Sequence, residues 1–143
     1  MLDEESESAM KVLLAYDGSE GARRALDVVL GLTGQDDRVT VVGVAEGIPI
    51  FGYAGTLPSP EQELERDRQL SEVDEALGER GISVTLVPRA GDPATTILDV
   101  AERDGFDLIV MGTRGLGTAE RWLIGSVSDK VLHHAHCSVL VAR

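Results

Sequence analysis

The fold is decided by residues 12–19, VLLAYDGS, in which a short apolar run stops at a turn and a helix start. A continuous apolar run such as residues 12–16 is typical of a strand buried in a parallel sheet. Asp17 and Gly18 are turn residues, and Ser19 is a favoured N-cap for a following helix. The stretch therefore predicts a strand that leads directly into a helix.

The same alternation of short apolar runs and amphipathic stretches continues along the chain. After Ser19, apolar residues recur at helical spacing until Gly34 supplies a stop. Further strands are predicted at residues 39–44, 82–87, 108–111 and 138–142, and Pro88 is expected to close the third strand. Further helices are predicted at residues 60–80, in a segment that begins at Pro93, and at residues 126–135. The predicted fold class is α/β, a single doubly wound open sheet of five parallel strands with four helices.

Residues 46–60 interrupt this alternation. The segment is rich in Gly and Pro, contains Phe51 and Tyr53, and shows no regular period, which predicts a long loop. Loops of this length in compact domains often carry a function.

Length and composition limit the domain count and the cellular setting. With 143 residues the chain has the usual size of one domain, which we expect at residues 10–143. Residues 1–9 are acidic and polar, the opposite of a secretory signal, and are expected to be a short leader on a cytoplasmic protein. No apolar run approaches the ~18 residues of a membrane span, and a single cysteine, Cys137, excludes an intramolecular disulfide.

The charge balance narrows the class of partner. A net charge of −12 argues against nucleic-acid binding, which depends on clustered Lys and Arg. Only two of the 13 basic residues are lysines, against 25 acids. Such a surface suits a very salty cytoplasm, where charges are strongly screened, but it is equally compatible with an ordinary acidic protein.

The loop between Gly112 and Ser126 carries the strongest functional signal. Glycines let the backbone approach a ligand closely, and the free N–H groups of a helix start favour phosphate. The segment follows the predicted fourth strand and leads into the last helix, so it lies where open α/β sheets bind ligands. It is neither a Walker A loop nor a dinucleotide-binding G-x-G-x-x-G, because the glycine spacing differs and no Gly-Lys-Ser/Thr occurs. We expect this loop to bind an anionic group.

The spacing of Gly112, Gly115, Gly125 and Ser126 is Gly-x2-Gly-x9-Gly-Ser. With this signature the chain resembles the ATP-binding universal stress proteins, from residues 12–19 to residues 125–132. The resemblance implies strand order 3-2-1-4-5, binding of ATP or another adenine nucleotide, and a Mg²⁺ ion bound through the phosphates. The residues implied at the adenosine end are Asp17, Val44 (through its backbone), Met111 and Gly112. The residues implied around the phosphates are Gly115, Gly125, Ser126 and Val127.

The resemblance also implies a homodimer joined through strand 138–142. The apolar residues 139–141 agree with this, because they would otherwise leave an exposed edge. The leading hypothesis is therefore a nucleotide-dependent regulatory dimer of the stress-response type, with no catalytic residue assigned. Two alternatives stay open: a slow Mg²⁺-dependent ATPase or phosphotransferase that uses Glu120 or Asp17, and a nucleotide-free scaffold dimer.

One histidine-rich segment allows a second kind of site. His133, His134, His136 and Cys137 are all potential metal ligands. His133 and His134 are adjacent in a predicted helix and point to different sides of it, so solvated or packed histidines are favoured over a metal site.

Overall fold

A sheet of five parallel strands forms the centre of the computed structural model, which describes residues 9–113 and 125–143. Its strand order is β5-β2-β1-β6-β7. The strands are β1 (Lys11–Ala15), β2 (Arg38–Ala45), β5 (Ser83–Ala90), β6 (Leu108–Gly112) and β7 (Ser138–Ala142). Counted along the chain these are strands one to five, so the order is 3-2-1-4-5. The predicted α/β fold class and strand order are both confirmed.

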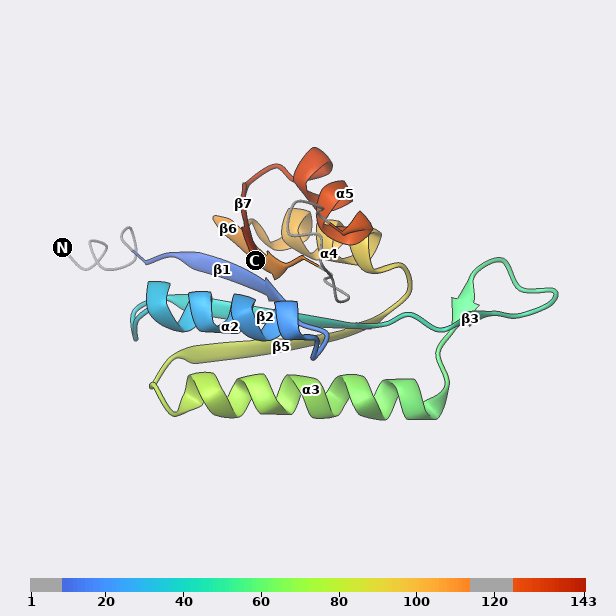
Figure 1. The fold of residues 1–143 in the computed structure, drawn as a ribbon, viewed down its shortest axis with the longest axis horizontal. Helices are drawn as coiled ribbons and strands as arrows, with labels where there is room; N and C mark the ends of the chain where they lie inside the picture. Colours follow the sequence, from blue (N-terminus) through green and yellow to red (C-terminus); the bar gives the residue numbers. More distant parts are fainter. Residues whose placement is uncertain (1–8, 114–124) are drawn as a thin grey trace.

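Four helices cover the two faces of this sheet in the described part of the chain (Figure 1). They are α2 (Glu20–Leu32), α3 (Pro60–Gly78), α4 (Pro93–Asp104) and α5 (Ser126–His134). Helices α2 and α3 pack on one face, and α4 and α5 pack on the other. The sheet is thus covered on both faces, as a doubly wound fold requires.

Side-chain caps begin three of these helices. The side chains of Ser19, Ser59 and Asp92 each accept a hydrogen bond from a backbone N–H in the first turn. Ser59 forms a capping box, because the Gln62 side chain accepts in return from the Ser59 N–H at 2.7 Å. These starts agree with the sequence-based prediction, since each cap is a residue with a short polar side chain.

The core is divided by the sheet into two layers, and β1 supplies both of them. Val12 and Leu14 pack with α2 and α3, whereas Leu13 packs with α4 and α5. All three are essentially inaccessible to solvent. The alternation follows from the two-residue period of a strand, whose successive side chains point to opposite faces.

The prediction that Pro88 closes the third strand is wrong. Strand β5 continues through Pro88 to Ala90, with Pro88 in register with Gly43 of β2. β5 pairs only with β2 among the described strands, so a proline N that cannot donate a hydrogen bond is tolerated on its open side.

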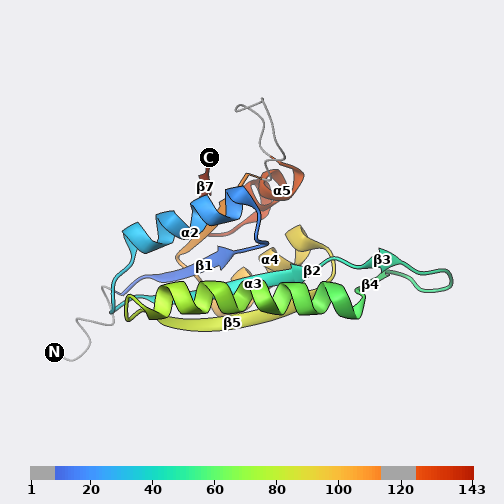
Figure 2. The ribbon, with the colours of Figure 1, turned by 60° about the horizontal axis from the view of Figure 1, so that its bottom comes forward.

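The prediction of an irregular loop over residues 46–60 is also incomplete. Residues 48–57 form a small antiparallel hairpin of β3 (Ile48–Pro49) and β4 (Thr56–Leu57). The hairpin extends away from the body of the protein, beyond the N-terminal end of α3 (Figure 2). Strands of two residues carry too little periodicity to be detected in a sequence.

Candidate functional site

The candidate site is a cleft at the point where the strand order reverses. From β1 the chain proceeds to β2 on one side, and the later strand β6 pairs with β1 on the other side. Open α/β sheets bind ligands in the crevice beyond the carboxyl ends of two such strands. The cleft here lies at those ends and is partly open to solvent.

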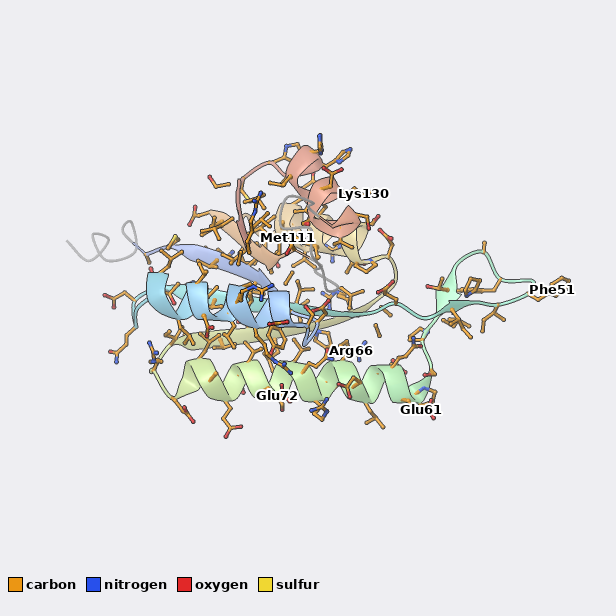
Figure 3. All side chains as sticks on the ribbon, in the orientation of Figure 1. Phe51, Glu61, Arg66, Glu72, Met111 and Lys130 are labelled. Atoms are coloured by element: carbon orange, nitrogen blue, oxygen red, sulfur yellow. The ribbon has the colours of Figure 1, made fainter. Side chains whose placement is uncertain are left out.

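Five of the eight residues predicted for nucleotide binding line this cleft. They are Asp17, Val44, Met111, Gly112 and Val127. They come from four separate segments, namely the ends of β1, β2 and β6 and the first turn of α5. Figure 3 shows Met111 inside the body of the protein. The fold thus gathers residues that are up to 110 positions apart in the chain.

Of the other three predicted residues, two are not in this lining and one is outside the described residues. Gly125 and Ser126 are not among the residues that line the cleft, although they directly precede Val127 at the start of α5. Gly115 lies outside the described residues, as does Glu120, the alternative catalytic candidate.

Asp17 is held by the turn in which it lies. Its Oδ1 accepts a hydrogen bond from the Ser19 N–H at 2.9 Å. The Tyr16 N–H, one residue earlier, donates to the Val42 carbonyl oxygen at 3.0 Å and continues the β1–β2 pairing past the end of β1. The carboxylate therefore stands on a backbone that is fixed on both sides, with one oxygen not used by this turn.

Helix α5 begins without a side-chain cap. Its N-cap is Gly125, which has no side chain to accept from the first-turn N–H groups, whereas α2, α3 and α4 are capped by Ser19, Ser59 and Asp92. The first turn of α5 reaches the cleft through Val127 and the buried Ser128, whose Oγ donates to the Gly125 carbonyl oxygen at 3.1 Å. An uncapped helix start next to a cleft favours a negatively charged group.

The cleft has apolar walls and two carboxylates. Val42, Val44, Ile97 and Met111 supply the apolar surface, and Asp17 and Glu46 supply the carboxylates. Apolar walls of this kind accept the faces of a flat ring, and carboxylate oxygens accept hydrogen bonds from hydroxyl or amino groups. Combined with the α5 start, the arrangement suits a molecule with a ring, hydroxyl groups and an anionic end.

Several lining residues were not predicted from the sequence. They are Ala15, Tyr16, Ser19, Ala22, Val42, Glu46, Pro93, Ile97, Thr113 and Ser128. Glu46 could have been found, since it directly follows a strand whose carboxyl end faces the site. Ile97 could not have been found, because it is a buried residue of α4, 3% exposed, and core packing explains its apolar side chain equally well.

A charged cap lies beside this cleft on α4. The Asp92 side chain accepts a hydrogen bond from the Thr95 N–H at 2.9 Å. This bond, with the Thr95 hydroxyl and the attraction of Lys130, lowers the pKa of Asp92 below its ordinary value. Asp92 therefore stays ionised and stabilises the start of the helix that carries Pro93 and Ile97.

Around the histidine-rich segment, as elsewhere in residues 9–113 and 125–143, no group of three or more candidate metal ligands is found. The Nδ1 atoms of His133 and His134 lie 2.8 and 2.9 Å from the carbonyl oxygens of Asp129 and Lys130, four residues earlier. Burial raises the pKa of the Cys137 thiol, and the charge of Asp107 adds to this effect. The contacts at Nδ1 engage His133 and His134 within their own helix.

No helix within residues 9–113 and 125–143 combines the length and the apolar composition that a membrane span requires.

Known proteins resemble this chain over almost its whole length. Residues 9–143 match the universal stress protein family. A universal stress protein of Thermus aquaticus, encoded in the QAH/OAS sulfhydrylase 3′ region, is 40% identical over 139 residues, which cover 92% of this chain and 97% of the relative.

Solved structures share the fold at lower sequence identity. A universal stress protein in complex with cAMP superimposes with a TM-score of 0.72 at 22% identity, covering 95% of this chain and 98% of the other. An Arabidopsis thaliana family protein with AMP bound gives a TM-score of 0.68 at 22% identity, covering 93% and 90%. The family match over residues 9–143 and the relative with 40% identity show that the chain belongs to the universal stress protein family.

Proposed function

We propose that this protein binds an adenine nucleotide, ATP with Mg²⁺ in the first place, in the cleft at the carboxyl ends of β1 and β6. The observation that carries the proposal is the convergence of Asp17, Val44, Met111, Gly112 and Val127 on one cleft. Two structural relatives contain cAMP and AMP, which supports an adenine nucleotide as the class of ligand.

Each part of the nucleotide has a matching feature. The apolar walls at Val44 and Met111 accept the adenine ring, and Asp17 accepts hydrogen bonds from the ribose hydroxyls. The phosphates lie toward the uncapped start of α5, at Gly125, Ser126 and Val127, and toward the glycine loop that includes Gly115. Mg²⁺ is bound through the phosphates.

We further propose that nucleotide occupancy regulates a stress-response homodimer in the cytoplasm. The dimer is joined through β7, which pairs only with β6 among the described strands and so presents an unpaired edge. Its Val139, Leu140 and Val141 are only partly buried in the single chain, which supports contact with a second copy. The domain of residues 10–143 is expected to carry this function, and residues 1–9 a separate leader.

Nucleotide analysis tests the proposal directly. The purified protein is denatured, and any released nucleotide is identified by chromatography and mass spectrometry. MgATP, AMP and adenosine are then titrated by calorimetry into nucleotide-free protein, at low and at molar salt. Saturable adenylate binding with one site per chain is expected, and GTP serves as the ligand control.

Absence of adenylate binding under both salt conditions would contradict the proposal and would favour the scaffold dimer. Sustained release of phosphate from bound MgATP, over many turnovers per chain, would instead favour the ATPase or phosphotransferase alternative.

A further inference from the structure

The hairpin of β3 and β4 has no role in the cleft described above. We call residues 47–58 the arm; it contains both strands and the turn between them. The two ribbon views agree that the arm runs away from the sheet and its helices (Figures 1 and 2). Figure 3 shows Phe51 at its far end, distant from Met111. The arm is therefore neither part of the core nor a cover of the cleft.

Exposed apolar side chains are concentrated on the arm. Five of the eight large apolar side chains that are exposed in the described residues belong to it: Ile48, Ile50, Phe51, Tyr53 and Leu57. Phe51 is fully exposed, and Tyr53 is 52% exposed. The other three, Leu32, Leu64 and Leu132, stand singly on three different helices. Isolated exposed apolar residues are ordinary, whereas a contiguous group marks an interaction surface.

The base of the arm is tightly packed. The Thr56 hydroxyl donates to the Glu46 carbonyl oxygen at 2.7 Å. Gly47, with φ of +77°, lies so close to the other side of the arm that a Cβ on it would be 2.5 Å from the Leu57 carbonyl carbon. The packed base holds the two sides of the arm together, so the arm presents its apolar side chains on a defined structure.

Charge indicates what kind of partner the arm contacts. Residues 47–60 contain no Asp, Glu, Lys or Arg and form the longest such run in a chain with a net charge of −12. Two copies of the body repel each other, but contact between two projecting arms brings together uncharged segments while the acidic bodies stay apart. The arm also carries none of the basic residues that favour an anionic lipid surface.

A second copy of the chain offers the matching surface. The other three exposed large apolar side chains of the described residues lie on three different helices, so the arm holds the largest group of such side chains that a second copy offers. Such a contact is isologous and closes after two copies. We propose that two copies of this protein associate arm to arm, with Phe51 and Tyr53 at the centre of the contact.

The proposal does not rest on nucleotide binding, and it is separate from an interface through β7. If β7 does not join two chains, arm contact converts monomers into dimers. If β7 also joins two chains, arm contact links those dimers into tetramers or longer assemblies. In both cases association through the arm at least doubles the mass of the particle.

Sedimentation velocity of the full chain tests this doubling. Wild-type protein and Phe51→Glu are compared over a concentration series in about 0.1 M and about 1 M salt, since the Debye length falls from ~10 to ~3 Å between them. At high concentration and high salt the wild type is expected to have at least about twice the mass of Phe51→Glu. Leu32→Glu, a control on α2 with 47% exposure, is expected to keep the wild-type mass.

Cross-linking locates the contact. In a Cys137→Ser background, Ala54→Cys at the turn of the arm is expected to form a disulfide-linked pair of chains on mild oxidation, and Leu32→Cys is not. Equal masses for the wild type and Phe51→Glu at every concentration would overturn the proposal. So would Phe51-dependent flotation with phosphatidylcholine vesicles by a wild type that shows no mass difference from the variant, because the arm would then bind lipid.

Discussion

Gly21 of α2 and Gly112 of β6 meet backbone to backbone beside the cleft. A Cβ on Gly112 would lie 2.3 Å from the carbonyl carbon of Gly21, and a Cβ on Gly21 would lie 2.4 Å from the carbonyl oxygen of Thr113. Neither distance leaves room for a side chain. The Thr113 N–H also donates to the Ala142 carbonyl oxygen at 3.2 Å. The residues that lead into the glycine loop are thus placed by α2 on one side and by β7 on the other.

Gly21→Ala is expected to lower the free energy of unfolding by about 1–3 kcal/mol, because the added methyl group overpacks a contact between two backbones. Gly31→Ala is the matched control on the same helix, where a Cβ would meet nothing within 4 Å. It is expected to leave stability unchanged or raise it by up to about 1 kcal/mol through helix propensity. Urea unfolding measures both, and equal effects of the two substitutions would show that the Gly21 contact does not restrict the side chain.

Asp17→Asn is expected to weaken adenosine and MgATP binding by a similar factor, about tenfold or more, because a charged hydrogen-bond acceptor is replaced by a neutral group. The amide oxygen can still accept from the Ser19 N–H, so the turn is retained. Asp36→Asn removes the same charge from an exposed site in the turn after α2 and is expected to leave affinity unchanged. Calorimetric titration compares the three proteins; an unaltered affinity for Asp17→Asn would remove this residue from the proposed site.

Asp92→Ala is expected to cost about 1 kcal/mol of stability near neutral pH, because the start of α4 loses its cap. The folded-state pKa of Asp92 lies below its ordinary value of 3.8, so its charged form stabilises the fold above that pH. This contribution is lost as the pH falls through the folded-state pKa, and the difference between wild type and Asp92→Ala is therefore expected to shrink in acid.

The pH dependence has its own control. Asp92→Asn keeps a capping oxygen but cannot titrate, so its stability relative to Asp92→Ala is expected to stay constant with pH. Thermal unfolding between pH 7 and pH 3 measures all three proteins. A wild-type advantage over Asp92→Ala that persists unchanged into strong acid would contradict a role for the charge.

Ser59→Ala is expected to destabilise the protein by about 1 kcal/mol, since it removes half of the capping box that begins α3. Ser71→Ala, an exposed substitution in the middle of the same helix, is expected to be neutral or slightly stabilising. Unfolding in urea distinguishes them.

Local patterns were sufficient to predict most of the elements. The apolar run at residues 12–16, the caps Ser19, Ser59 and Asp92, and the final strand at 138–142 all occur close to where the sequence placed them. Such signals act between near neighbours, through backbone sterics, capping and the period of apolar residues. The same local rules, with right-handed crossovers, were sufficient for the α/β class.

Elements with weak local signals were predicted poorly. The arm has strands of two residues, and Pro88 lies inside a strand only because β5 is at the edge of the sheet. Whether a strand is at an edge or in the centre depends on its neighbours, and the residues of the strand alone do not show it.

By itself, the sequence determined the order and type of the main elements and, with the family resemblance, predicted that Asp17, Met111 and Gly112 near the ends of strands bind a ligand. Tertiary structure alone decided that Ile97 of α4 and Glu46 after β2 join them in one cleft, and that Gly21 must pack without a side chain against Gly112, 91 residues away. The physical reason is that burial and close approach are properties of pairs of segments. A residue's own chemistry limits which neighbours it can accept, but only the packed fold selects them.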